Sequence, residues 1–187
     1  MHYVTIDGTV RKLWSSDATA YADHLLRLDP ASRRNRFGGA VADQFLSHHA
    51  EAAFEPANVI YGFIADGVVR GAAELRPFGA GRAEAAFSIE KPWQSHGVGT
   101  ELLERILLAA RNRGIKQLHI TCLLENQRMQ QLARKFDAEL RRDVDSVIGQ
   151  VDAPYPTPLS VMREMIADST GLTTVMLDAQ QRLLKRA

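Results

Sequence analysis

Three short apolar runs in the middle of the chain alternate with turn-forming residues and predict strands. The first two, residues 59–65 and 68–76, are joined by Asp66-Gly67, a dipeptide that supplies the positive φ angles of a tight hairpin turn. The third run covers residues 82–89 and follows a second, glycine-rich turn. Because both connections are short, the three runs predict an antiparallel meander.

Apolar residues then change to helical spacing over residues 98–113, soon after the third run. The apolar face of this helix comprises Val98, Leu102, Leu103, Ile106, Leu107 and Ala110. Gly114 ends the helix, because a left-handed cap is easiest for a residue without Cβ. Residues 118–124 are the next apolar run. Since a helix separates this run from residues 82–89, we expect the two strands to lie parallel, with a right-handed connection.

Polar and apolar positions predict further elements on both sides of this unit. They are an extended segment over residues 2–14, helices over 15–28, 31–37, 41–54 and 126–136, and a strand over 146–152. This order predicts an α+β fold, in which a mixed, mostly antiparallel sheet is flanked by helices. A proline-rich segment separates this domain, residues 1–153, from a C-terminal helical extension over residues 154–187.

The extension carries two predicted amphipathic helices on either side of Gly171. Their apolar positions include Leu159, Met162, Met165, Ile166, Leu172, Val175, Met176, Ala179, Leu183 and Leu184. These apolar faces are expected either to pack on the sheet or to join two copies of the chain. Because the symmetric dimer is the commonest oligomer, we predict a homodimer that forms through the extension.

Composition argues against several classes of function. The chain has 23 basic and 22 acidic residues, so its net charge does not favour nucleic acid or a membrane surface as a partner. A single cysteine, Cys122, gives no disulfide framework and no cysteine-rich metal site. His48 and His49 point in different directions on a helix, so we expect no metal there. The lack of a long apolar stretch or a leader pattern favours a cytoplasmic protein.

The segment between the third strand and the main helix can bind an anion. Residues 94–99, of sequence QSHGVG, lead into a helical turn whose first backbone N–H groups have no partner within the helix. The helix dipole adds partial positive charge at this end, and glycine lets a phosphate approach the amides closely. A plain tight turn without a ligand is the alternative interpretation.

The same segment resembles the Q/R-x-x-G-x-G/A acetyl-CoA signature of the GCN5-related N-acetyltransferase (GNAT) superfamily. Residues 126–136 are similar to the second motif of that family, a helix opened by Asn after the next strand. The resemblance covers about residues 9–153 and implies the GNAT fold, with acetyl-CoA as co-substrate. The pyrophosphate would lie on backbone amides, and the pantetheine arm would pair with the third strand. The implied cofactor contacts are Phe87, Ser88, Ile89, Gln94, Ser95, His96, Gly97, Val98, Gly99, Thr100 and Asn126.

The sequence departs from the family pattern at the position of the general acid. Many GNAT proteins carry Tyr seven residues after that Asn, as the acid for the leaving thiolate, whereas this chain has Ala133. Asp137-Ala138 also replaces the usual Gly-Phe pair. The sequence therefore supplies no tyrosine acid at this position. Protonation by water, protonation by another residue, and slower chemistry are the alternatives.

A strand carboxylate is the candidate general base, because an ammonium acceptor must lose a proton before or during attack. Glu84 lies where many bacterial relatives carry Glu, and strand alternation puts it on one face with Ser88. Burial beside small residues would strengthen Glu84 as a base. Glu74 on the preceding strand is the second candidate, and Tyr61 and Glu90 remain open. A salt-bridged strand residue is the alternative interpretation of both leading carboxylates.

The resemblance implies transfer of an acetyl group from acetyl-CoA to the primary amine of a small molecule by direct attack. A protein-lysine or protein N-terminal acetyltransferase is one alternative, because residues 29–37 look similar to a segment of bacterial protein acetyltransferases. A non-catalytic acyl-CoA-binding regulatory module is another, because the usual tyrosine is missing. Arg33, Arg34 and Arg36 could clamp an acidic group on the acceptor, or they could form a solvated helix face.

Overall fold

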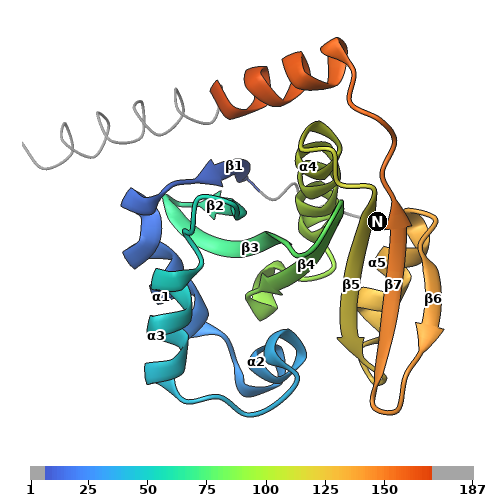
Figure 1. Cartoon of the computed structure of the whole chain (residues 1–187). Coiled ribbons are helices and arrows are strands. Elements are labelled where there is room, and N and C mark those ends of the chain that lie inside the picture. Colours follow the sequence, from blue (N-terminus) through green and yellow to red (C-terminus); the bar gives the residue numbers. More distant parts are fainter. Residues whose placement is uncertain (1–6, 170–187) are drawn as a thin grey trace, which may run out of the picture.

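The computed structural model describes residues 7–169 and contains one sheet in the strand order β1-β2-β3-β4-β5-β7-β6 (Figure 1). The strands are β1 (Thr9–Leu13), β2 (Val59–Ala65), β3 (Val68–Pro77), β4 (Arg82–Ile89), β5 (Gln117–Leu123), β6 (Glu139–Arg142) and β7 (Ser146–Asp152). The helices are α1 (Ala18–Arg27), α2 (Pro30–Phe37), α3 (Asp43–Ala52), α4 (Val98–Asn112) and α5 (Gln127–Lys135), with 3₁₀ turns at Ser15–Asp17 and Lys91–Trp93. The mixed, mostly antiparallel α+β architecture is confirmed, because within residues 7–169 only β4 and β5 pair in parallel.

The predicted meander and crossover are both present. Strands β2, β3 and β4 pair antiparallel in sequence order, and Asp66 and Gly67 take φ angles of 51° and 68° in the hairpin turn. Helix α4 then connects β4 to the parallel strand β5. Strand β6 was not predicted from the sequence, because its residues ELRR show no apolar alternation. This strand lies at the edge of the sheet, where charged side chains discourage pairing with another chain.

Helices cover both faces of the β1–β4 half of the sheet. Helix α4 packs Leu102, Leu103 and Ile106 against one face, and α1 and α3 pack Leu25 and Leu46 against the other. All five side chains are fully buried, and each such burial stabilises the fold by about 1.5–3 kcal/mol. Helix α5 packs beside the other half of the sheet, against β5, β6 and β7. The candidate site lies where the two halves meet.

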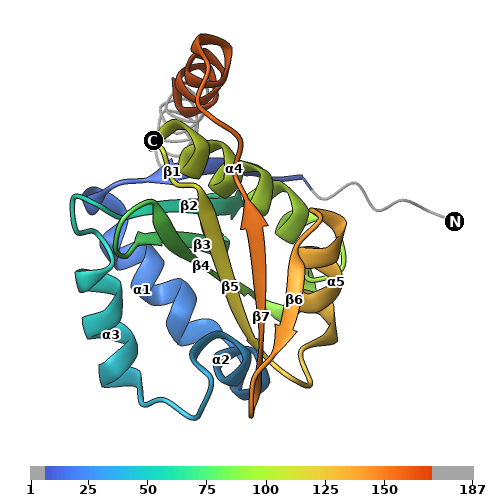
Figure 2. The ribbon, with the colours of Figure 1, turned by 45° about the vertical axis from the view of Figure 1, so that its right-hand side comes forward.

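Strands β4 and β5 pair only near their first residues. Their register ends at Glu84 opposite His119. Beyond this point β4 continues beside β3, whereas β5 continues beside β7. The sheet therefore opens between the two strands, and α2 lies across the opening in contact with both of them (Figure 2).

The C-terminal extension begins with a helix over residues 158–169, close to the end of α4 (Figure 1). Glu164 of this helix accepts hydrogen bonds from Arg113 at 2.6 Å and from Asn112 at 2.7 Å. The second predicted helix of the extension, including Met176, lies outside the described residues. Within the described part of the chain, no helix is long and apolar enough to cross a membrane.

Candidate active site

The loop between β4 and α4 has the backbone geometry that an anion site needs. Ser95 and Gly97 have positive φ angles of 64° and 89°, and Gly97 is the N-cap residue of α4. A Cβ added to Gly97 would meet no atom within 4 Å, so the space beside the loop is open. A Cβ at Gly99 would lie 3.3 Å from Leu132 and 3.4 Å from Ile89. The first amides of α4 therefore border open space, and the chain packs closely two residues further on, at Gly99.

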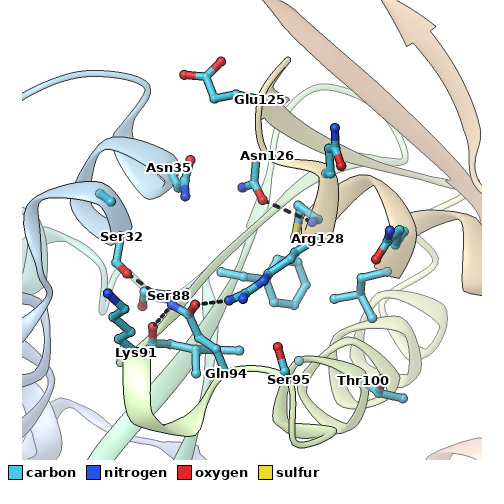
Figure 3. Close-up of a pocket in the computed structure, with 18 of the residues that line it drawn as sticks. Ser32, Asn35, Ser88, Lys91, Gln94, Ser95, Thr100, Glu125, Asn126 and Arg128 are labelled. Carbon is cyan, nitrogen blue, oxygen red and sulfur yellow. Dashed lines mark hydrogen bonds between the residues drawn. The ribbon is translucent and has the colours of Figure 1, made fainter.

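A cavity of about 810 Å³ lies between this loop, α2 and the start of α5 (Figure 3). Its volume falls in the range that is typical of ligand sites. The predicted cofactor contacts that line it are Phe87, Ser88, Ile89, Gln94, Ser95, Gly97, Gly99, Thr100 and Asn126. Of the other two, His96 is exposed, whereas Val98, the first residue of α4, is buried in the core. The structure thus brings nine of the eleven predicted residues to one cavity, while their contacts with a cofactor stay predictions.

Gln94 connects three elements at this cavity (Figure 3). Its Nε2 donates to the backbone oxygen of Ile89 at 2.8 Å and to Ser32 Oγ at 3.1 Å, and its Oε1 accepts from Arg128 at 2.6 Å. One side chain therefore ties the end of β4 to α2 and α5. A wall that is fixed before a ligand arrives lowers the entropic cost of binding.

Basic side chains set the charge of the cavity wall. Lys91, Arg128 and Lys135 line it, together with the carboxylates Asp29 and Glu125. Both carboxylates already have partners, because Asp29 is the N-cap of α2 and Glu125 pairs with an arginine of that helix at 3.2 Å. The excess of positive charge beside the amides of α4 suits a ligand with several phosphate groups.

The segment after β5 begins its helix as predicted but supplies no tyrosine. Asn126 is the N-cap of α5, and its Oδ1 accepts a hydrogen bond from the amide of Met129 at 3.1 Å. Ala133 is buried, and none of the described residues that line the cavity is a tyrosine. Asp137 has a φ angle of 58°, in the left-handed region that Asp tolerates better than most residues. This conformation explains how Asp replaces the glycine of the family pattern.

Comparison with known proteins shows the family to which this chain belongs. The model of the acetyltransferase (GNAT) family matches residues 25–138, which are more than half of the chain. The chain belongs to the GNAT family of acetyltransferases. The protein is therefore an acetyltransferase that uses acetyl-CoA as its co-substrate, and the resemblance seen in the sequence is confirmed.

Solved structures of GNAT proteins from several bacteria share the fold. The GNAT domain of S. lividans PAT aligns with a TM-score of 0.68 and 21% identity over 78% of this chain and 90% of that chain. The yncA protein of Salmonella typhimurium was solved with its cofactor acetyl-CoA. It gives a TM-score of 0.63 and 17% identity, over 81% of this chain and 96% of that chain. The ribosomal-protein-S18-alanine N-acetyltransferase of Escherichia coli gives a TM-score of 0.62 and 14% identity, over 81% of this chain and 97% of that chain.

In this GNAT enzyme, Glu84 lies where β4 and β5 separate. Its side chain is exposed, not buried as the sequence analysis expected, and it does not line the cavity. His119 is its register partner on β5, and within the described part of the chain the buried Nε2 of His119 has no hydrogen-bond partner. Registered residues on neighbouring strands project to the same face, so the two side chains are neighbours. Sequence reasoning missed His119 because neither strand alone reveals the register.

Glu74, the second candidate base, is enclosed by donors. Its oxygens accept hydrogen bonds from Tyr21 at 2.5 Å, from Arg76 at 2.8 Å and from Arg36, and His49 Nε2 lies 3.0 Å away. Burial alone would raise the pKa of Glu74, but the charge of Arg36 and the hydrogen bond from His49 outweigh it and hold that pKa far below its usual range. A carboxylate held this way is a weak proton acceptor, so the geometry favours a structural role.

Replacing this buried carboxylate should destabilise the fold. We expect Glu74→Gln to lower the free energy of unfolding by about 3 kcal/mol, because it leaves Arg36 without its counter-charge in the interior. The pKa of Glu74 is depressed in the folded state, so its contribution is complete above its ordinary value of 4.5 and is lost as the pH falls below that value. Urea unfolding should therefore show a gap between wild type and variant at neutral pH that narrows in acid. Equal stability at neutral pH would contradict this assignment.

The arginines of α2 have partners within the chain. Arg33 donates to the backbone oxygen of Leu28 at 3.0 Å, at the end of α1. Arg36 is largely buried and pairs with Glu74, so neither a solvated helix face nor a substrate clamp describes it. Arg34 is exposed and pairs across the opening of the sheet with Glu125. These arginines therefore connect α2 to both halves of the sheet.

The other sequence candidates lie away from the cavity. Tyr61 is buried, its hydroxyl lies 3.5 Å from Glu164, and burial raises its pKa. His48 is exposed, whereas His49 belongs to the cluster around the buried carboxylate of β3. Among residues 7–169, no group of three or more His, Cys, Asp or Glu side chains is placed to hold a metal ion.

Proposed function

We propose that this enzyme transfers the acetyl group of acetyl-CoA to the primary amine of a small molecule, by direct attack of the amine on the thioester. The observation that supports the proposal is a cavity that runs from the amides of α4 to residues 87–89 of β4. On this part of β4, one edge pairs with β3, and the pairing with β5 has already ended. An extended pantetheine arm can pair with the other edge as an added strand does. The thioester would then lie near the end of β4.

Acetylation of an ammonium acceptor requires the loss of two protons. The first must leave before attack, because only the neutral amine is a nucleophile. We assign this proton to Glu84, whose exposed carboxylate can accept it and release it to bulk water. Glu84 is three residues from Phe87, which is about 10 Å along a strand, so the transfer needs an intervening water. The second proton leaves the nitrogen as the N–C bond forms.

The position of α2 supports a small acceptor. This helix lies across the opening between β4 and β5 and is linked to both sides. Ser32 bonds to Gln94 on the β4 side, and Arg34 pairs with Glu125 on the β5 side at 3.2 Å. A bridged opening of this kind admits a slender amine more readily than a folded protein surface.

An amino group on a protein is the second candidate acceptor. The Escherichia coli enzyme with the same fold acts, by its name, on the alanine of ribosomal protein S18. A lysine side chain or an extended N-terminus is also slender enough to pass a bridged opening. Proteins of one fold can take different acceptors, because acceptor specificity depends on side chains around the site.

Mass spectrometry of acceptors incubated with acetyl-CoA tests the proposal. The panel should contain small primary amines, their N,N-dimethyl analogues as controls that cannot form an amide, lysine peptides and proteins with free N-termini. We expect acetylation of a small primary amine with a higher kcat/KM than any peptide, and none of its dimethyl analogue. Acetylation confined to peptides or proteins would assign the second candidate. Acetylation of no amine at all would contradict both.

We also propose that the enzyme forms a homodimer through its C-terminal extension. Exposed apolar side chains on the helix over residues 158–169 support this, with Met162 52% exposed and Met165 67% exposed. Methionine adapts to irregular partner surfaces. We expect Met162→Glu combined with Met165→Glu to give a monomer by light scattering that still binds acetyl-CoA. A wild type that is monomeric at micromolar concentration would contradict the proposal.

A further inference from the structure

A serine, a histidine and a glutamate form a hydrogen-bonded chain behind the cavity. Ser88 Oγ lies 2.9 Å from His24 Nε2, and His24 Nδ1 lies 3.2 Å from Glu90 Oε1. His24 belongs to α1, whereas Ser88 lies on β4 and Glu90 directly follows that strand. The exposed fractions are 0% for His24, 5% for Ser88 and 7% for Glu90, so bulk water hardly competes for these bonds. Ser88 also lines the cavity (Figure 3), so its chain of partners leads from the interior to the cofactor site.

The partners of Glu90 determine which nitrogen of His24 donates a hydrogen bond and which one accepts. Glu90 accepts hydrogen bonds from Arg27 at 2.9 Å and from Arg70 at 3.0 Å. Burial would raise the pKa of Glu90, but hydrogen bonds from His24, Arg70 and Arg27 outweigh it and keep the group ionised. An ionised carboxylate only accepts, so His24 Nδ1 carries a proton and donates it to Glu90. The His24 Nε2 atom is then the acceptor for the hydroxyl of Ser88.

His24 is poised to take a proton and return it. Burial lowers the pKa of His24, although the adjacent Glu90 acts in the opposite direction, so the ring is neutral at neutral pH. The carboxylate beside Nδ1 stabilises a transient imidazolium, as the third member of a hydrogen-bonded triad does. His24 can therefore be protonated transiently during the reaction and returns to its neutral form afterwards.

The position of Ser88 fits the step for which this enzyme has no tyrosine. Residues 87–89 are where the proposed pantetheine arm ends, and Ser88 is the residue among them whose side chain carries a hydroxyl. Ala133 occupies the position of the usual tyrosine acid and is buried. Glu84 is four residues away on the strand, about 13 Å by strand geometry, and is therefore too distant to protonate the same sulfur directly.

We propose that Ser88, backed by His24 and Glu90, carries the second proton of the reaction from the attacking nitrogen to the CoA sulfur. This inference rests on the proposed acetyl transfer. As the N–C bond forms, the nitrogen gives a proton to Ser88 Oγ while the Ser88 hydroxyl proton moves to His24 Nε2. As the C–S bond breaks, the proton returns from His24 through Ser88 to the thiolate. The amide and CoA thiol are released, and the three side chains end in their starting states.

Ser88 touches the reacting atoms in this scheme and is a catalytic residue, whereas His24 and Glu90 act through it and position it. A purely structural chain predicts a different outcome, because loss of the hydroxyl would then change stability and leave turnover intact. An activated serine could also attack the thioester itself, which would leave an acetyl group on Ser88. Each of these outcomes can be measured.

Hydroxylamine is a suitable probe acceptor, because it is small and is already neutral at neutral pH. The enzyme-dependent formation of acetohydroxamate from acetyl-CoA is measured for wild type, Ser88→Ala, Ser88→Thr and His24→Gln, with the uncatalysed rate subtracted. We expect Ser88→Ala and His24→Gln to lower kcat by about 10²–10⁴-fold, the usual size of a general acid–base contribution. The acetyl-CoA Kd from calorimetry should not change, and Ser88→Thr should recover much of the rate. Ser47→Ala and His48→Gln on α3 are the matched controls.

Full turnover by Ser88→Ala would overturn the inference while leaving the proposed function in place. A loss of thermal stability without a fall in kcat would also overturn it, because the chain would then be structural. An acetyl group on Ser88, seen by mass spectrometry of the wild type after brief mixing with acetyl-CoA, would replace the relay by a covalent mechanism. A wild type that acetylates neither hydroxylamine nor any amine of the panel would overturn the proposed function and the inference together.

Discussion

Replacing Gly97 by Asp is expected to abolish binding of acetyl-CoA. Gly97 is the N-cap of α4, and a side chain there would project into the open space beside the first amides of the helix. A carboxylate in that space would repel the pyrophosphate and occupy its place. Isothermal titration of the folded variant with acetyl-CoA measures the effect, and an unchanged affinity would remove the phosphate site from this loop.

Gly97→Asn is the matched control for this experiment. The φ angle of 89° at Gly97 is one that Asn and Asp tolerate better than other residues with a side chain, so both variants carry a similar backbone strain. They are nearly the same size and differ in charge. We therefore expect the Asn variant to lose less affinity than the Asp variant. Equal losses would show that the effect is steric and that charge at the start of α4 contributes little.

Glu84→Gln is expected to lower turnover of an alkylamine acceptor by about 10²–10⁴-fold, with the affinity for acetyl-CoA nearly intact. The amide cannot accept the proton of an ammonium, whereas the cavity proposed for the cofactor does not include this residue. Initial rates with a saturating alkylamine measure the loss. Because hydroxylamine arrives without the first proton, its rate should fall less than that of the alkylamine.

Two further variants define what the Glu84 result means. Glu51→Gln removes an exposed carboxylate from α3 and should keep wild-type turnover. Glu74→Gln should reduce stability more than turnover, because its carboxylate is tied to arginines in the interior. Full turnover by Glu84→Gln together with loss of turnover by a folded Glu74→Gln would move the base to β3.

The sequence predicts those parts of the fold that depend on local pattern. Asp66-Gly67 marks a hairpin turn by itself, and the spacing of leucines after Gly99 marks α4. A helical crossover joins parallel strands, so the helix also predicts that β5 runs parallel to β4. The strand β6 could not be predicted, because its charged residues gain their strand geometry by pairing with β7 rather than from their own pattern.

In the candidate site as well, the sequence predicts the residues that are close along the chain, but not those brought together by packing. Residues of the glycine loop are neighbours in sequence, so the motif alone brings most of the predicted cofactor contacts together. The bond between His24 and Ser88 joins residues 64 positions apart, and a sequence pattern carries no sign of it. The exposure of Glu84 and the enclosure of Glu74 likewise depend on which helices cover each strand. Packing, not local pattern, separates these two carboxylates.

We propose that acetyl-CoA lies in the opening between β4 and β5, with its thioester beside Ser88. A crystal structure of the wild-type enzyme with coenzyme A tests this placement most directly. We expect the pyrophosphate on the amides at the start of α4, the pantetheine arm paired with residues 87–89, and the sulfur within reach of Ser88 Oγ. A coenzyme A bound on another face, or one whose sulfur lies far from the end of β4, would contradict it.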